Sequence, residues 1–448
     1  MLFALLLSGA AFATTYEYTL GNGLKLIVRE DHRSPVVISQ IWYKAGSIDE
    51  VNGVTGVAHV LEHMMFKGTE KIPGGEFSRR IAAAGGRENA FTSRDYTGYF
   101  QQLHISRLPL AMELESDRMR NLVLTEEEFA KEIRVVMEER RLRTDDQARA
   151  LVHEKMTATS YQTHPYRHPV VGWMNDLENM SVHDAKEWYD RWYAPNNAVL
   201  VVVGDVNPDD VFALAQRFYG HIKRREVPAL DERKPQTEPK QIGIKRLVVK
   251  APARLPYLAM GYHAPVLRNP GTDWEPYALE MLAGVLDGNE SARLNKNLVR
   301  EQRVADSASA SYDSTARGPG MFYLVGTPSE GKTAADLEAA FRNEMERLVR
   351  DGVTEEELTR VKAQLVAGYI FRLDSISFQA MEIGQLESIG LSYRDVDTML
   401  KGLQAVTAEQ VRAVARKYLD DDSLTVAVLD PQPLEQKAAP ASPPGLRH

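Results

Sequence analysis

The side chains best suited to chemistry stand within five residues of one another: His59, Glu62 and His63. The surrounding residues 56–66 are mostly apolar and predict a helix with one buried face. Residues four apart lie one above the other on a helix, so both imidazoles can bind one metal ion. Glu62 stands beside them, where its carboxylate can take a proton from a water molecule on that ion. The stretch therefore predicts a hydrolytic metal site.

Such a site needs a third protein ligand, because a catalytic zinc ion binds three side chains and leaves a fourth position to water. The best source is a carboxylate-rich helix predicted over residues 132–141. Glu132 and Glu139 are seven residues apart and share one face of this helix, whereas Glu138 points about 100° away. Glu139 and Glu138 both remain candidates for the third ligand.

These motifs resemble a known family, the inverzincin zinc peptidases that include pitrilysin, insulin-degrading enzyme and the mitochondrial processing peptidase. In that family a helix about 75 residues after His-x-x-Glu-His provides a zinc-binding glutamate, and here Glu139 follows His63 by 76 residues. The resemblance spans nearly the whole chain after residue 13. It implies Zn²⁺ as cofactor, with His59, His63 and Glu139 as ligands. It also implies that Glu62 is the catalytic base and that Glu132 orients or tunes the site.

The composition is that of a large globular protein. Its 448 residues are too many for one ordinary core and predict two or more domains. The net charge of −8 comes without a lysine and arginine block, which argues against nucleic acid and anionic membrane surfaces as partners. The absence of cysteine excludes disulfides, thiolate zinc sites and thiol catalysis.

The first 13 residues form a short apolar run that ends in Ala11-Phe12-Ala13, the pattern of a signal peptide cleaved after Ala13. We therefore expect an exported protein, periplasmic or secreted. No basic residue precedes the run, so a start upstream of Met1 stays open, as does a buried N-terminal strand or helix. No other segment approaches 18 apolar residues, and no membrane span is expected.

The chain carries an internal repeat. Residues 125–129 recur at 354–358, an offset of 229, and residues 192–205 are paralleled by 417–430, an offset of 225. Two landmarks with nearly one offset indicate a duplicated domain. We expect a signal peptide at 1–13, an N-terminal zinc-binding domain at 14–222, a linker at 223–243, a homologous C-terminal domain at 244–431 and a disordered tail at 432–448.

Each half mixes β-rich runs, such as 36–43, with amphipathic helices, such as 208–219, which predicts an α+β fold. The resemblance adds that each half is a mainly antiparallel sheet backed by helices, and that the halves face each other as a half-clam. Shifting the histidine motif by the repeat offset reaches residues 284–292, which contain no histidine. Glu139 shifts to 364–368, where no carboxylate occurs. Only the first half can hold this zinc site.

Two further regions concern the substrate. Residues 85–92 read as a glycine turn followed by a strand, whose exposed edge could pair with an extended peptide. Asn89 and Ala90 resemble the substrate-binding strand of the family, although a hairpin with Gly85-Gly86 in its turn explains the glycines equally well.

Active family members place an arginine and a tyrosine, seven residues apart in the second half, against the substrate. Arg300 matches the arginine and would bind substrate, but Ser307 stands at the tyrosine position. A salt-bridge role for Arg300 is the alternative. The departure suggests that a homologous subunit supplies the pair in a heterodimer, with a homodimer as the other possibility.

The sequence thus predicts a zinc metalloendopeptidase that hydrolyses peptides or unfolded polypeptides through a zinc-activated water, with Glu62 as general base. The alternative is a weakly active or non-catalytic peptide-binding subunit of a hetero-oligomeric peptidase. A zinc hydrolase that acts on other substrates is the third reading.

Overall fold

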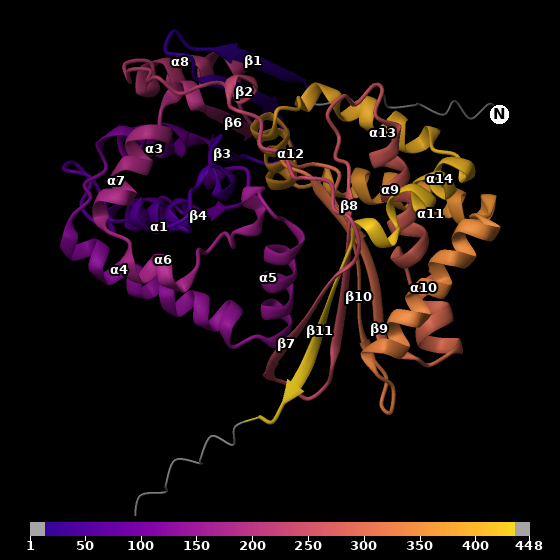
Figure 1. The fold of residues 1–448 in the computed structure, drawn as a ribbon. Coiled ribbons are helices and arrows are strands. Elements are labelled where there is room, and N and C mark those ends of the chain that lie inside the picture. The colour runs from indigo at the N-terminus through magenta and orange to yellow at the C-terminus, as the bar shows by residue number, and fades with distance from the viewer. Residues whose placement is uncertain (1–13, 435–448) are drawn as a thin grey trace, which may run out of the picture.

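The computed structural model describes residues 14–434, and Figure 1 shows their path. The expected signal peptide at 1–13 lies outside the described residues, as does the expected tail from residue 435 on. We expected the disordered tail to begin at residue 432, but this residue still belongs to the folded part of the chain. Gln432 is the last residue of a strand, β11, and pairs with Pro252.

The first half is built on a six-stranded sheet with the order β1-β2-β6-β3-β5-β4. Only β2 and β6 run parallel; every other neighbouring pair is antiparallel. The central strand β6 is apolar and buried along its whole length, as expected of a strand covered on both faces. The strands are β1 Thr15–Thr19, β2 Lys25–Glu30, β3 Val36–Tyr43, β4 Arg87–Thr92, β5 Thr97–His104 and β6 Ala198–Gly204.

The second half repeats this topology in five strands with the order β7-β11-β8-β10-β9. Its one parallel pair, β7 with β11, corresponds to β2 with β6, and the other pairs are again antiparallel. The predicted duplication and the α+β class are therefore confirmed. The strands are β7 Lys245–Pro252, β8 Tyr257–Ala264, β9 Ala305–Tyr312, β10 Gly320–Pro328 and β11 Leu424–Gln432.

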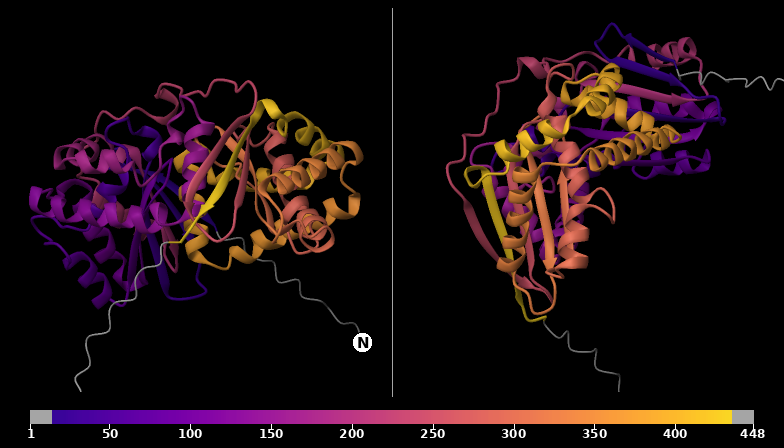
Figure 2. Two further views of the ribbon diagram at one scale, coloured as in Figure 1. Left: turned by 60° about the horizontal axis from the view of Figure 1, so that its bottom comes forward. Right: turned by 90° about the vertical axis from the view of Figure 1, so that its right-hand side faces the viewer.

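Helices cover both sheets, and the two halves lie side by side (Figure 2). The repeated threonines both cap helices: the Thr125 hydroxyl accepts from the Glu128 N–H, and the Thr354 hydroxyl from the Glu357 N–H. No described helix is both long and apolar enough for a membrane crossing. The helices are α1 Val57–Met64, α2 Glu76–Ala83, α3 Leu108–Asn121, α4 Glu126–Arg140, α5 Ala148–Ser160, α6 Met174–Asn179, α7 Val182–Trp192, α8 Pro208–Tyr219, α9 Trp274–Asp287, α10 Ala334–Asp351, α11 Glu355–Arg372, α12 Ile376–Ile389, α13 Val396–Ala405 and α14 Ala408–Tyr418.

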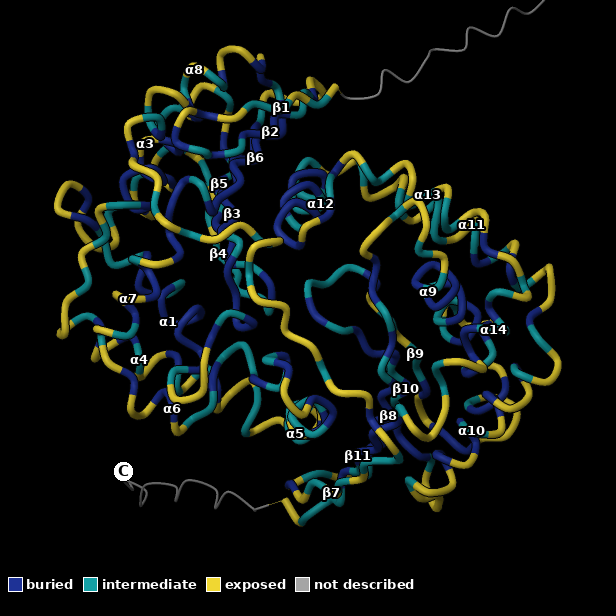
Figure 3. Tube along the Cα trace, turned by 45° about the horizontal axis from the view of Figure 1, so that its top comes forward, coloured by how far each residue is buried: buried dark blue, intermediate teal, exposed yellow. Residues whose placement is uncertain are grey.

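The halves exchange one helix each. α5 belongs to the first half in sequence but packs on β7, β8 and β11 of the second sheet, whereas α12 packs on β3 and β6 of the first. Figure 3 shows α12 as a largely buried helix beside the first sheet. The helices begin at Ala148 and Ile376, which are 228 residues apart, so the exchange follows the repeat. The expected domain boundaries at 14–222 and 244–431 therefore do not coincide with the packing units.

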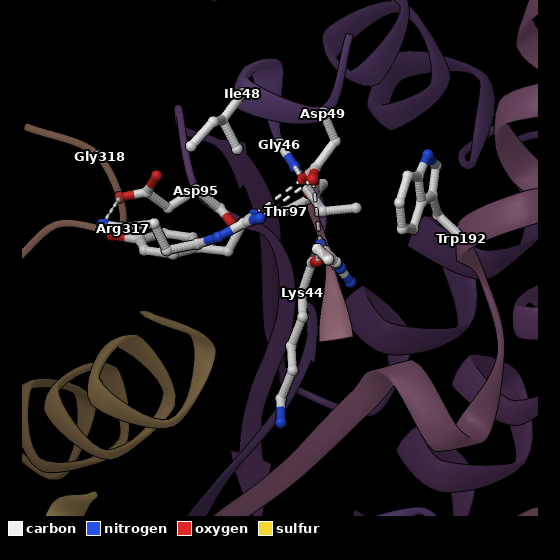
Figure 4. A network of polar contacts seen from close by, with 12 residues as sticks. Lys44, Gly46, Ile48, Asp49, Asp95, Thr97, Trp192, Arg317 and Gly318 are labelled. Carbon is white, nitrogen blue, oxygen red and sulfur yellow. Dashed lines mark hydrogen bonds and ion pairs between the residues drawn. The ribbon is translucent and has the colours of Figure 1, made fainter. Parts of the chain in front are cut away.

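A buried ion-pair network joins the halves (Figure 4). Arg317, between β9 and β10, binds both oxygens of Asp49 at 2.8 and 3.0 Å. Its backbone N–H donates to Asp95, in the turn between β4 and β5, at 3.0 Å. Arg233, from the linker, reaches Asp49 at 3.1 Å. The network ties the turn after β4 to the second half.

Candidate metal centre

The helix α1 presents the predicted ligands because its apolar residues hold it in the core. Val60, Leu61 and Met64 are fully buried, which leaves the imidazoles of His59 and His63 to face a cavity. The helix begins at Gly56, whose φ of +89° favours glycine. A Cβ at this position would come within 2.6 Å of the Val171 carbonyl oxygen, so no other residue fits without a shift.

The structure brings His59, His63 and Glu139 together. Each offers one ligand atom, and these atoms lie within 4.8 Å of one another. His59 Nε2 is 3.6 Å from one oxygen of Glu139, and His63 Nε2 is 3.4 Å from the other. Zinc ligands at about 2.0–2.1 Å in a tetrahedron are about 3.3 Å apart, close to both distances. The donor set and its spacing therefore fit a zinc ion.

The protonation of His59 also suits a metal ligand. Burial, followed by the neighbouring charge of His63, lowers the pKa of His59 to about 3. The imidazole is therefore neutral at physiological pH, as metal binding requires. The Nδ1 atom of His59 is buried and has no hydrogen-bond partner within residues 14–434.

Of the two candidates for the third ligand, the structure favours Glu139. Glu138 is exposed and pairs with Arg141 at 3.0 Å. Glu139 lines the cavity and is also held by Arg143, at 2.5 Å. Arg143 lies in a π-helical turn, Arg141–Asp145, that follows α4; such turns often occur at functional sites. Sequence periodicity gave no signal for Arg143.

Glu132 contacts His63 on the ring nitrogen that faces away from Glu139. One of its oxygens lies 3.0 Å from His63 Nδ1, and the other pairs with Lys67. A carboxylate on the far nitrogen of a metal-binding imidazole fixes the tautomer and the orientation of the ring. The geometry therefore gives Glu132 a positioning contact, in agreement with the orienting role that the resemblance implied.

Glu62 points into the same cavity, and Thr92 holds it there. The Thr92 hydroxyl, at the end of β4, donates to Glu62 Oε2 at 2.5 Å. Burial raises the pKa of Glu62 above the usual value for a carboxyl, which makes it a better proton acceptor. Thr92 was not singled out in the sequence because the contact joins residues 30 apart.

Glu50 is another residue that the sequence did not reveal. Its two oxygens accept from the backbone N–H groups of Gly56 and Ala58, at 2.8 and 2.9 Å, and so cap the first turn of α1. Burial raises the pKa of Glu50 to about 8, and the two backbone hydrogen bonds oppose the rise. The residue stabilises the start of the helix that carries both histidines.

The metal cavity has a volume of about 680 Å³, and Asn89 and Ala90 line it. They lie on β4, one of the two edge strands of the first sheet. Gly85 and Gly86 join α2 to β4, and the hairpin turn of β4 and β5 lies at residues 93–96. The alternative of a hairpin turn at these glycines is therefore wrong.

Arg300 does not line this cavity. It is exposed, and its guanidinium donates to the Glu290 carbonyl oxygen at 2.8 Å. Ser307 is likewise exposed, on β9. The substrate role expected for Arg300 stays a prediction to which this geometry adds no support.

Comparison with known proteins identifies the family. Residues 25–172 match the family model described as insulinase (peptidase family M16), and residues 179–365 match the peptidase M16 inactive domain. The chain belongs to peptidase family M16. The inactive-domain match fits the second half, because within residues 14–434 the only group suited to a metal ion is His59, His63 and Glu139.

The M16 relatives include proteins named as zinc proteases. The chain is 32% identical to the zinc protease PqqE of Helicobacter pylori, over 92% of each chain. It is 25% identical to the uncharacterized zinc protease YmxG of Bacillus subtilis, over 92% of this chain and 98% of that one.

Solved M16 structures share the fold. The crystal structure of a protease from Helicobacter pylori has a TM-score of 0.87 at 30% identity, and covers 94% of this chain and 100% of that chain. The periplasmic protease PqqL of Escherichia coli has a TM-score of 0.80 at 18% identity, over 97% of this chain and 51% of that one. At 18% identity, the likeness to PqqL shows a shared fold alone.

Proposed function

We propose that this M16 protein is a zinc-dependent endopeptidase. The observation that carries the proposal is the convergence of His59, His63 and Glu139 at tetrahedral spacing, with Glu62 in the same cavity. A zinc ion held there supplies a Lewis acid that makes water nucleophilic near neutral pH and polarises a peptide carbonyl.

Glu62 moves the proton. Thr92 occupies Oε2 of its carboxylate, so Oε1 is the atom that accepts the proton of the attacking water. The same atom then delivers the proton to the departing amine, which releases the two peptide fragments without a covalent intermediate on the protein. Glu132 and Lys67 hold the ring of His63 in place during these steps.

The peptide lies along β4 in this proposal. No strand of the described chain pairs with the outer edge of β4, which can therefore accept an extended peptide as an added strand. The Ala90 N–H now donates to the side-chain oxygen of Asn89 at 2.9 Å. A substrate carbonyl that replaced this oxygen would receive the same hydrogen bond, so Asn89 and Ala90 are the proposed substrate-binding residues.

We further propose an exported location and a partner. The apolar segment 1–13 supports export, and the fold likeness to a periplasmic protease agrees with it. The exposed Arg300 and Ser307 leave the catalytic cavity without the arginine and tyrosine expected of the family, which supports a homologous subunit that supplies them.

The test of peptidase function uses matched glutamate variants of the purified chain. Glu62→Gln should keep about one zinc ion per chain and lose hydrolysis, because the ligands remain while the proton acceptor is lost. Glu139→Gln should lose the metal, and Glu138→Gln, its exposed neighbour, should keep both metal and activity. Metal analysis and digestion of a peptide mixture measure the two properties. Near wild-type rates for Glu62→Gln would refute the mechanism.

A further inference from the structure

A second cavity adjoins the metal cavity. It has a volume of about 650 Å³ and shares Thr144, Val170 and Val171 with the metal cavity. Its walls come from both halves of the molecule: Arg94 and the segment 167–171 from the first, and Ser311 and Tyr323 from the second. Ser311 and Tyr323 face each other across β9 and β10. A peptide in the metal cavity can therefore extend into this second cavity.

The second cavity carries an excess of positive charge. No carboxylate within residues 14–434 pairs with Arg94, whose guanidinium lies over the Tyr166 ring at 5.1 Å. Arg167, also on the wall, donates to the Gln162 carbonyl oxygen. The acidic side chain on the wall, Glu154, is already bound by Arg140 at 2.8 and 3.1 Å. The two arginines are left to attract an anion.

His168 adds an independent sign of a ligand. It lines the cavity and is only 6% exposed, yet neither ring nitrogen has a hydrogen-bond partner in the described chain. Buried polar groups without partners are uncommon and cost about 1–3 kcal/mol each. Burial and the charge of Arg167 lower the pKa of His168, so the neutral ring can donate from one nitrogen. Both nitrogens have almost no exposed surface, so a carboxylate in the cavity accepts that hydrogen bond only once the ring turns toward it.

The turn that carries Arg94 is held in place. Its neighbour Asp95 accepts from the Tyr166 hydroxyl and from the Arg317 N–H. Arg94 also stands two residues beyond Thr92, the hydroxyl that contacts Glu62. Arg94 lies in the hairpin turn at residues 93–96, so its backbone is at most about 7 Å from that of Thr92.

We propose that Arg94, Arg167, His168, Ser311 and Tyr323 form a carboxylate-binding subsite for a peptide bound at the metal centre. The carboxylate is an acidic side chain near the cleaved bond or the C-terminal carboxylate of the peptide. The subsite rests on the proposed function, because it requires a peptide along β4. It also gives the second half, which lacks metal ligands, a direct part in substrate selection.

The test measures binding apart from turnover. The full-length, zinc-loaded Glu62→Gln protein is titrated with fluorescein-labelled alanine-rich peptides. One series carries a single glutamate at successive positions, a matched series carries glutamine, and each is made with a free or an amidated C-terminus. Binding is followed by fluorescence anisotropy. We expect the preferred carboxylate form to bind about tenfold to a hundredfold more tightly than its neutral match.

Variants assign that preference to the subsite. Arg94→Gln should remove most of the difference, Arg94→Lys should retain part of it, and Arg167→Gln should reduce it. The control Arg107→Gln, an exposed arginine away from both cavities, should retain all of it. If tighter binding requires the glutamate, the subsite binds an acidic side chain. If tighter binding requires the free C-terminus, the subsite binds the terminal carboxylate.

Equal binding of all peptide forms, or an Arg94→Gln protein with an undiminished preference, overturns the subsite. The same peptides given to the wild-type protein separate this result from the proposed function. Hydrolysis without a carboxylate preference refutes the subsite alone. A carboxylate preference in binding, with no hydrolysis even in the presence of the homologous subunit, refutes the peptidase function and leaves the subsite standing.

Discussion

At the scale of single residues, the site depends on pairs that hold the reacting groups. Thr92 fixes Glu62, Arg143 fixes Glu139, and Glu132 fixes His63. Each contact restricts the orientation of one of these groups. Metal affinity and proton transfer should therefore respond to residues that never touch the substrate.

The variant Glu132→Gln tests this expectation at the contact between Glu132 and His63. The amide can still accept from His63, but it loses the charge that polarises the ring and pairs with Lys67. We expect zinc affinity to fall about 10-fold to 100-fold, as is typical for such contacts. Competition with a chromogenic chelator measures the change. Glu127→Gln, exposed on the same helix, is the control, and equal affinities of the two variants would contradict the positioning role.

At the scale of elements, the exchange of α5 and α12 decides how closely the halves fit. Gly384, inside α12, lies against the buried Trp42 of β3. A Cβ on Gly384 would come within about 2.0 Å of the indole ring. The absence of a side chain at this position is what allows α12 to lie on the first sheet.

Gly384→Ala should therefore destabilise the protein by about 1–2 kcal/mol, since overpacking outweighs the gain in helix propensity. Gly368→Ala is the matched control. Gly368 is exposed inside α11 with no atom near its missing Cβ, so alanine should stabilise by about 0.5–1 kcal/mol. Thermal unfolding of both variants gives the comparison. A Gly384→Ala protein as stable as Gly368→Ala would show that α12 does not pack tightly on β3.

At the scale of the whole molecule, the two similar halves contribute different residues to the two neighbouring cavities. The first holds the three proposed metal ligands, and the second places Tyr323 and Ser311 beside the metal cavity. The ion pair of Asp49 and Arg317 and the helix exchange fix the halves to each other. The arginine and tyrosine pair expected of an active member is still absent from the cavity lining.

The isolated chain should therefore bind zinc yet cleave peptides slowly, and a homologous subunit that carries the pair should raise the rate. Loss of one donor to the developing oxyanion costs about 100-fold to 1,000-fold in turnover. Peptide hydrolysis by the chain alone and with a co-purified partner measures the effect. Brisk turnover by the monomer, unchanged in Arg300→Ala, would show that neither Arg300 nor a partner is needed.

The sequence by itself was enough to predict the duplicated α+β fold, and it named the side chains that the fold brings together at the candidate metal centre. Most of this follows from local rules: His59 and His63 are one helical turn apart, a β-rich run marks β3, and an amphipathic pattern marks α8, whereas the choice of Glu139 came from the family resemblance. Each local feature can be recognised from residues close together in the chain.

Only the tertiary structure decided the contacts made at long range. Thr92 meets Glu62 across 30 residues, α12 crosses to the sheet of the other half, and Tyr323 lines the same cavity as Arg94. Arg300, which matches the arginine of the family motif, contacts the Glu290 carbonyl oxygen and does not line the metal cavity. Periodicity specifies which face of an element is buried but not which distant element covers it, because that depends on how whole surfaces fit together.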